Sequence, residues 1–173
     1  MKGCAESLIH PFPPTWDEKS EILILGSFPS IKSREMAYYY GHPQNRFWRV
    51  AAILYSDSVP QTVEERRSFL LRHHIALWDV IASCTIVGSS DSSIRHAVPN
   101  DIQPILEGAE IRGIYTNGQT AYRLYQKHML PHVDREAICL PSTSPANAAW
   151  SLERLTEAWR NLLSVSSLPG NTL

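Results

Sequence analysis

Two stretches of the chain combine polar side chains, aromatic rings and turn-forming residues in a pattern that suits the binding of a flat ring. The first runs Gly26-Ser-Phe-Pro-Ser30 and, after a short basic segment, Tyr38-Tyr-Tyr-Gly-His-Pro-Gln-Asn-Arg-Phe-Trp48. A strand that ends in glycine and turns through proline can bring backbone N–H groups against a ligand, and tyrosines offer faces for stacking. We therefore expect a substrate site that includes Gly26, Ser27, Phe28, Pro29, Ser30, Tyr39 and Tyr40.

The same stretch concentrates positive charge. From Ile31 to Arg49, four basic residues oppose only Glu35, so the local net charge is +3 (four minus one) on a chain whose net charge is −1. Such a cluster can meet the phosphates of a nucleic acid. The expected phosphate contacts are Lys32, Arg34, Arg46 and Arg49.

The second stretch is Leu140-Pro-Ser-Thr-Ser-Pro-Ala-Asn147. Small hydroxyl residues between two prolines predict a stiff polar loop that can meet a phosphate backbone or enter a groove. Asn117, which follows another predicted strand, either borders the same pocket or makes a turn with Gly118. The expected substrate contacts here are Asn117, Ser142, Thr143, Ser144, Pro145 and Asn147.

Each of these features also has a purely structural interpretation. Gly26 and Pro29 suit an ordinary strand exit, and Asn45 suits the start of a helix that contains Phe47 and Trp48. The tyrosines can pack a loop. Taken singly, these structural uses are the commoner ones, and only the combination of all the features favours a site.

Together the two stretches resemble the uracil-DNA glycosylase superfamily. Its mismatch-specific branch ends the first motif with His-Pro-x-Asn-Arg-Phe-Trp, which His42-Pro-Gln-Asn-Arg-Phe-Trp48 matches closely. Both motifs occur in the right order, and the strand and helix pattern of nearly the whole chain is compatible with the superfamily. Tyr40 aligns with the aromatic position on which the superfamily stacks an extruded base, and Tyr39 is expected to line the same pocket.

One position departs from the mismatch-specific pattern. Phe28 stands where those enzymes carry an asparagine that positions the attacking water. With its paired tyrosines before Gly-His-Pro and its Ser-Pro in the second motif, the chain looks like the hypoxanthine-DNA glycosylase branch. The resemblance implies that Asn45 is the catalytic residue, and it leaves open whether Asn45 orients the water or the edge of the base.

The elements that must position these residues follow from short aliphatic runs and helical periodicity. Strands are predicted at 21–27, 75–80, 111–116 and 137–140, and helices at 45–55, 62–73, 101–108, 119–130 and 152–163. Alternation of strand and helix predicts an α/β three-layer sandwich, with a mostly parallel four-stranded sheet covered by helices on both faces. Ligands of such sheets bind at the carboxyl ends of the strands.

Length and composition add limits. A chain of 173 residues with 43% hydrophobic residues fits one domain, 1–173, with an N-terminal extension over 1–18 and a flexible tail over 164–173. The net charge argues against a generally cationic DNA binder. Three scattered cysteines, Cys4, Cys84 and Cys139, cannot supply the four ligands of an iron–sulfur cluster and suggest reduced thiols. We expect no cofactor, no metal, no membrane span, a monomer, and a cytoplasmic protein that is nucleoid-associated if prokaryotic.

Some polar residues carry weaker signals. His73 and His74 abut a predicted helix end and do not suggest a metal site. Asp79 ends a predicted strand, where it can reach the site, although capping or pairing with Arg95 is the commoner role. Residues 91–93 are a further candidate for a DNA-facing loop, and no motif supports Cys84 as a thiol nucleophile.

The resemblance implies a monofunctional glycosylase that removes a deaminated base, hypoxanthine or uracil, from DNA with a damaged or mismatched base. Two other functions remain open at this level. One is a catalytically silent nucleic-acid or nucleotide-binding module on the same fold, since the usual water-holding asparagine is replaced by Phe28. The other is a hydrolase of free nucleosides or nucleotides, for which the second polar loop has no evident use.

Overall fold

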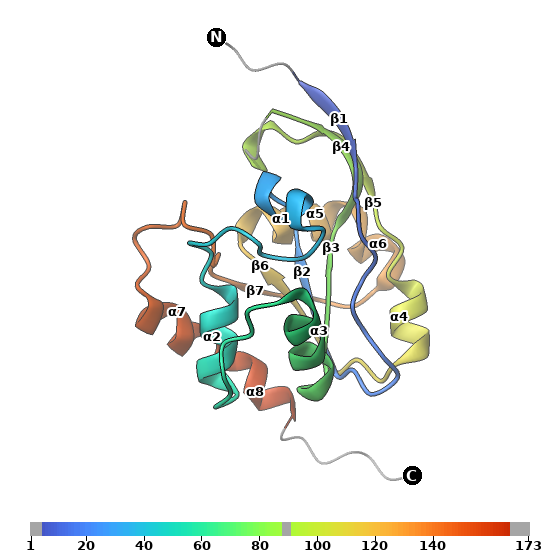
Figure 1. Ribbon diagram of the computed structural model, residues 1–173. Helices are drawn as coiled ribbons and strands as arrows, with labels where there is room; N and C mark the ends of the chain where they lie inside the picture. The colour runs from blue at the N-terminus through green and yellow to red at the C-terminus, as the bar shows by residue number, and fades with distance from the viewer. Residues whose placement is uncertain (1–4, 88–90, 167–173) are drawn as a thin grey trace.

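A parallel sheet of four strands forms the centre of the molecule (Figure 1). The structure is a computed structural model that describes residues 5–87 and 91–166. The strand order is β3-β2-β6-β7, with β2 at Ile22–Gly26, β3 at Ile75–Asp79, β6 at Gly113–Asn117 and β7 at Ile138–Leu140. These are the four predicted strands, and the predicted α/β sandwich is confirmed.

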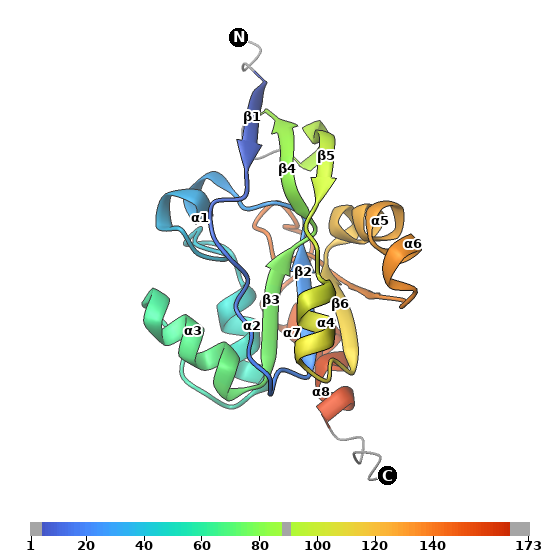
Figure 2. The same cartoon turned by 90° about the vertical axis from the view of Figure 1, so that its right-hand side faces the viewer.

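Helices cover both faces of this sheet (Figure 2). On one face lie α2 (Phe47–Leu54), α3 (Val63–Arg72), α7 (Leu152–Trp159) and α8 (Asn161–Ser166), and on the other lie α4 (Gln103–Gly108), α5 (Gln119–His128) and α6 (Leu130–Val133). The alternation of β2 explains the two cores. Ile22 and Ile24 pack with the first group of helices, whereas Leu23 and Leu25 pack with the second.

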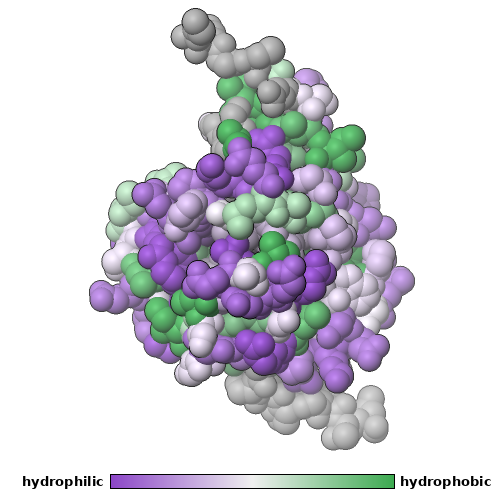
Figure 3. Space-filling view, in the orientation of Figure 1, coloured by the Kyte–Doolittle hydropathy of each residue, from purple (hydrophilic) through white to green (hydrophobic). Residues whose placement is uncertain are grey.

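A second, antiparallel sheet stands beyond the carboxyl ends of the central strands, at the top of Figures 1 and 2. Its order is β1-β4-β5, with β1 at Glu6–Ile9, β4 at Ile81–Ile86 and β5 at Arg95–Pro99. It carries exposed apolar side chains, among them Ile9 and Val98, and hydrophobic atoms gather at this end of the molecule in Figure 3. The sequence did not predict this sheet, because its outer strands are short and largely exposed.

Other elements differ from the predicted pattern in detail. The helix predicted over 45–55 begins at Phe47, and the one predicted over 152–163 is divided into α7 and α8. A short helix, α1 (Ile31–Met36), follows the first turn and was not predicted. Cys84 and Cys139 are free thiols, whereas Cys4 and most of the tail at 164–173 lie outside the described residues.

The segment 10–16 runs beside the central sheet. His10 N–H donates to the carbonyl of Ala82, and Thr15 forms an isolated bridge with Leu77 of β3. Among the helices that the structure describes, none is long and apolar enough to cross a membrane. The described residues also contain no cluster of three or more side chains that could ligate a metal ion.

Trp159 links the core to the second polar loop, and this contact can be tested. Its buried indole Nε1 donates to the carbonyl of Pro141 at 2.9 Å. Because an unsatisfied buried carbonyl is costly, we expect Trp159→Phe to lower the free energy of unfolding by about 1–3 kcal/mol in urea denaturation.

Trp78→Phe is the matched control, since the indole nitrogen of Trp78 has no hydrogen-bond partner among residues 5–87 and 91–166. It should cost less than Trp159→Phe. Equal losses would mean that the bond to Pro141 contributes nothing beyond packing.

Candidate functional site

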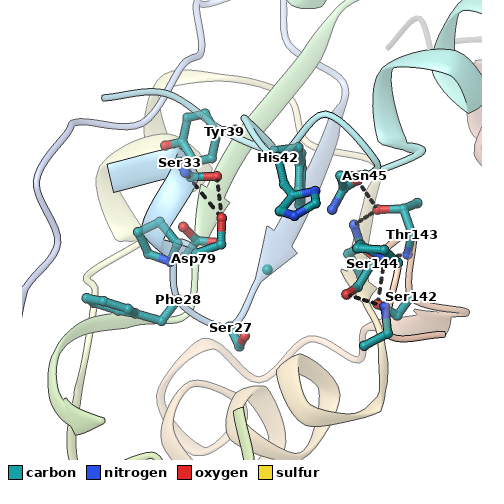
Figure 4. Close-up of a pocket in the computed structure, with 17 residues that line it drawn as sticks. Ser27, Phe28, Ser33, Tyr39, His42, Asn45, Asp79, Ser142, Thr143 and Ser144 are labelled. Atoms are coloured by element: carbon teal, nitrogen blue, oxygen red, sulfur yellow. Dashed lines mark hydrogen bonds between the residues drawn. The ribbon is translucent and has the colours of Figure 1, made fainter. Parts of the chain in front are cut away.

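A pocket of about 390 Å³ opens where the strands of the central sheet end (Figure 4). Its lining comes from the β2 turn, the segment 33–45, the end of β3, the end of β6 and the loop after β7. In Figure 4, Phe28, Ser27 and Asp79 lie on one side, Asn45 and Ser142 to Ser144 lie on the other, and His42 lies between them. The lining residues are Gly26, Ser27, Phe28, Pro29, Ser30, Ser33, Tyr39, Tyr40, His42, Asn45, Asp79, Asn117, Ser142, Thr143, Ser144, Pro145 and Ala146.

The turn after β2 is fixed by the strand beside it. The N–H of Val80 donates to the carbonyl of Gly26 at 2.8 Å, and the N–H of Ile81 donates to that of Ser27 at 3.1 Å. Ser30 begins α1, and its hydroxyl accepts from the N–H of Ser33. The turn is therefore held at both ends, as a preformed binding surface requires.

Thr143 joins the two predicted stretches. Its hydroxyl donates to Oδ1 of Asn45 at 2.9 Å and accepts from Nδ2 of Asn117 at 3.0 Å, while its backbone N–H donates to Oδ1 of Asn117 at 3.0 Å. Oδ1 of Asn45 also accepts from the N–H of Phe47 at 3.0 Å. Asn45 thus forms a local turn just before α2, whose N-cap is Arg46, so it is not the helix cap that the structural interpretation predicted, and it also lines the pocket.

These bonds fix the orientation of the Asn45 amide. Because Oδ1 already accepts two hydrogen bonds, the group of the side chain that remains to bind a ligand is the amide Nδ2, which only donates. The pocket therefore has a hydrogen-bond donor on this wall.

Arg46 closes the second loop onto the first. Its guanidinium donates to the carbonyl oxygens of Ser144 and Asn147, both at 3.0 Å, and to that of Trp150. Its backbone N–H donates to the carbonyl of Thr143 at 3.1 Å. We predicted a phosphate contact for Arg46. Its guanidinium instead binds carbonyl oxygens of the second loop, and we expect it to hold that loop in place.

The two tyrosines of the first stretch have different surroundings. Tyr40 has φ = 51° and stacks on Phe47 with ring centroids 4.4 Å apart, and it lines the pocket while partly exposed. Tyr39 is buried, packs edge-on against Phe12 at 4.7 Å, and donates from its hydroxyl to the carbonyl of Pro13. Burial, with the nearby charge of Asp79, raises the pKa of the Tyr39 phenol well above its usual range, so it stays protonated.

The floor of the pocket holds a buried carboxylate. Oδ2 of Asp79 accepts from Nε2 of His10 at 2.7 Å, and the two side chains are 5% and 4% exposed. Gly26 lies against Asp79, since a Cβ at position 26 would collide with Oδ1 and would lie 3.3 Å from the Tyr40 hydroxyl. From the sequence we expected capping or a pair with Arg95 for Asp79. Arg95 instead donates to the carbonyls of Ser92 and Ile94.

The structure brings most of the predicted site residues to one place. Asn147 does not line the pocket; its amide donates to the carbonyl of Ser142 within the loop. Among the predicted phosphate contacts, Lys32 is exposed and pairs with Glu35, Arg34 is half-buried, and Arg49 is exposed on α2.

Several lining residues were not predicted. His42 and Ala146 lie within the two stretches, and this position was the only sequence signal that could have identified them as lining residues. Ser33 also lines the pocket, and its hydroxyl accepts from the N–H of Gly41. The Nδ1 atom of His42 accepts from the N–H of Gln44 at 3.1 Å. His10 gave no signal at all, because it reaches the floor from a segment 69 positions away from Asp79.

Comparison with known proteins shows to which family the chain belongs. The family model of the uracil DNA glycosylase superfamily matches residues 13–163. The chain belongs to the uracil-DNA glycosylase superfamily. The resemblance predicted from the two stretches is thus confirmed.

Superfamily relatives cover most of the chain. It is 36% identical over 148 residues to a protein of Methanosarcina acetivorans named hypoxanthine DNA glycosylase, covering 84% of this chain and 92% of that one. A protein of the same name from Methanosarcina barkeri is 33% identical over 150 residues, covering 86% and 93%. A solution NMR structure of a candidate uracil DNA glycosylase from M. acetivorans has a TM-score of 0.74 and 34% identity, covering 90% and 99%.

The internal role of Arg46 leads to a prediction for the loop at 142–150. Arg46→Lys should speed backbone amide exchange in this loop by about 10- to 100-fold, because one ammonium cannot reach three carbonyls and hydrogen bonds to charged groups are strong. Arg49→Lys, on the exposed face of α2, should leave the exchange unchanged. If both variants exchange like the wild type, Arg46 does not hold the loop.

Proposed function

We propose that this chain is a monofunctional DNA glycosylase, which hydrolyses the bond between deoxyribose and a deaminated base, with hypoxanthine as its first substrate. The observation that carries the proposal is the pocket, whose lining combines the amide of Asn45, the ring of Tyr40 and the buried carboxylate of Asp79. The names of the relatives from Methanosarcina support the choice of hypoxanthine. Uracil is the second candidate base.

The substrate reaches such a pocket only after it leaves the duplex. A glycosylase extrudes its target nucleotide, which costs least when the base is mispaired. The volume of about 390 Å³ lies in the range of small-ligand pockets. In this proposal the base stacks on the face of Tyr40 opposite Phe47, and Ser142, Ser144 and Pro145 contact the DNA strand at the rim.

Bond cleavage moves negative charge onto the departing base and positive charge onto the sugar. Fixed donors that face the departing base lower the barrier, because they need no reorganisation during the reaction. The Nδ2 amine of Asn45 is such a donor, held by the bonds of Oδ1 to Thr143 and Phe47. We infer that Asn45 acts on the base edge rather than on the water, since its acceptor is already occupied.

Phosphate contacts complete the proposal. Lys32 and Arg49 are exposed, and Arg34, which shares α1 with Lys32, is half-buried, so these three side chains remain candidates for neutralising phosphates. Because Arg46 is used inside the protein, the basic cluster that meets DNA is smaller than the sequence predicted.

The alternative is a binding module without turnover. It is favoured by one observation: Phe28 packs in the second core cluster, so its side chain offers no polar atom for a water. Incubation with a duplex that contains deoxyinosine separates the two functions. Release of free hypoxanthine and an alkali-labile strand supports the enzyme, whereas tight binding without release supports the module.

Substitutions of Asn45 test its role as a donor. Asn45→Ala should lower the single-turnover rate of base release by about 10²- to 10³-fold, as loss of one such donor does in other enzymes. Asn45→Asp is the sharper change, because a carboxylate can still accept from Thr143 and Phe47 but presents an anion to the departing base. It should lose at least as much rate with little loss of thermal stability.

A different result for Asn45→Asp would reassign the residue. If Asn45 orients the water by accepting its proton, then aspartate should keep or raise the rate. A normal rate in Asn45→Ala, with normal thermal stability, would remove Asn45 from catalysis altogether.

Tyr40→Ala should weaken binding to a duplex that contains deoxyinosine more than binding to undamaged duplex, since stacking acts only on an extruded base. The difference should be about 1–3 kcal/mol in titrations followed by fluorescence anisotropy. Tyr40→Phe keeps the ring and should keep the preference. Equal weakening on both duplexes would mean that Tyr40 only packs on Phe47.

A further inference from the structure

An extruded base leaves a gap in the duplex, and the segments around the pocket differ in what they can put into it. Proteins that unstack DNA often insert a large apolar side chain between neighbouring bases. Such a side chain must be exposed and close to the mouth of the pocket. The second polar loop does not supply it, because its exposed residues are Ala146, Ala148 and Ala149, whose methyl groups are too short to take the place of a base.

Large apolar side chains are exposed instead on α1, the helix that follows the turn after β2. Ile31 is 45% exposed and Met36 is 41% exposed, at the two ends of this six-residue helix. The helix borders the pocket, because Ser30, just before it, and Ser33, within it, are lining residues. The other large apolar side chains that are exposed among residues 5–87 and 91–166 lie outside the two segments that form most of the lining, 26–45 and 142–146.

Met36 is the better placed of the two. It lies against Gly41, since a Cβ built on Gly41 would stand 2.7 Å from the Sδ atom of Met36. Gly41 is the residue between Tyr40 and His42, and both of these line the pocket. A methionine side chain is unbranched and flexible, so it can adapt to the faces of the bases that flank a gap.

The helix that carries Met36 is anchored at both ends. The hydroxyl of Ser30 accepts from the N–H of Ser33 at 3.2 Å, and the hydroxyl of Ser33 accepts from the N–H of Gly41 at 3.0 Å. At the other end, Ala37 closes the helix in a left-handed conformation with φ = 54°. The position of Met36 is therefore fixed before DNA arrives, while its exposed side chain remains free to enter a base stack.

We propose that Met36 is the wedge of this protein: it enters the base stack beside the extruded nucleotide and keeps that nucleotide from returning. This inference rests on the proposed function and adds to it the residue that holds the duplex open. Lys32, one turn earlier on α1, is also exposed and lies where it can neutralise a phosphate beside the gap. The wedge acts on extrusion and not on the glycosidic bond, so its loss slows only the steps before cleavage.

The test measures single-turnover release of hypoxanthine from two duplexes, one with thymine opposite deoxyinosine and the other with a pyrene nucleotide there. Pyrene is about as wide as a base pair, so it fills the stack, pushes the inosine out and replaces a protein wedge. On the thymine duplex, Met36→Ala should react about 10- to 100-fold more slowly than the wild type, because an apolar contact with a base face is worth about as much as a stacked base. On the pyrene duplex the two proteins should react at similar rates.

Three further variants control this comparison. Met36→Leu keeps an apolar side chain of similar size and should keep most of the rate on the thymine duplex. Ile53→Ala removes a side chain of similar exposure, 49%, at the end of α2 farther from Asn45, and should change neither rate. Asn45→Ala should stay slow on both duplexes, because pyrene cannot replace a group that acts on the departing base.

The inference is overturned if Met36→Ala reacts normally on the thymine duplex, since no wedge is then needed at this position. It is also overturned if Met36→Ala is equally slow on both duplexes, which would mean that Met36 only supports Gly41 and its neighbours in the pocket. A slow Met36→Leu variant would likewise exclude a simple apolar wedge. Failure of the proposed function looks different, because the wild type would then release no hypoxanthine from either duplex.

Discussion

The arrangement of the site depends on Thr143, a fully buried threonine whose four polar connections join three segments. Its hydroxyl bridges Asn45 and Asn117, its N–H reaches Asn117, and its carbonyl accepts from the N–H of Arg46. Because Asn45 and Thr143 are 98 positions apart, only the parallel sheet brings them together. Loss of this hydroxyl would leave the Asn45 amide held only by the bond from the N–H of Phe47, so the direction of its donor would be less firmly fixed.

Hydrogen bonds between polar groups around the pocket hold its walls in one arrangement. Arg46 satisfies three carbonyls of the second loop, and His10 satisfies one oxygen of Asp79. Such networks are costly to bury, but once complete they hold their members in one arrangement. The donors and acceptors are thereby oriented during folding, so little reorganisation of these groups is needed when the base enters.

The central sheet and the two motifs could be predicted because their signals are local. A buried parallel strand such as β2 is a continuous aliphatic run, and the residues 26–30 and 42–48 are contiguous. The partners of Arg46 and Asp79 could not be predicted, since main-chain carbonyls leave no mark in a sequence and His10 stands alone in an extended segment. The antiparallel sheet was missed for a related reason: β5, with its exposed Arg95 and His96, lacks the alternation that marks a half-buried strand.

The replacement at Phe28 is consistent with how the polar groups are distributed. Phe28 packs with the second core cluster, and its ring centroid lies 5.9 Å from that of His10 in an edge-on arrangement, so position 28 gives the pocket an apolar surface. Polar groups come instead from other residues, from Asn45 on the opposite side of the pocket and from Asp79 on the same side as Phe28 (Figure 4). The polar groups that the lining fixes are thus the amide of Asn45 and the carboxylate of Asp79, and Phe28 adds only an apolar surface beside them.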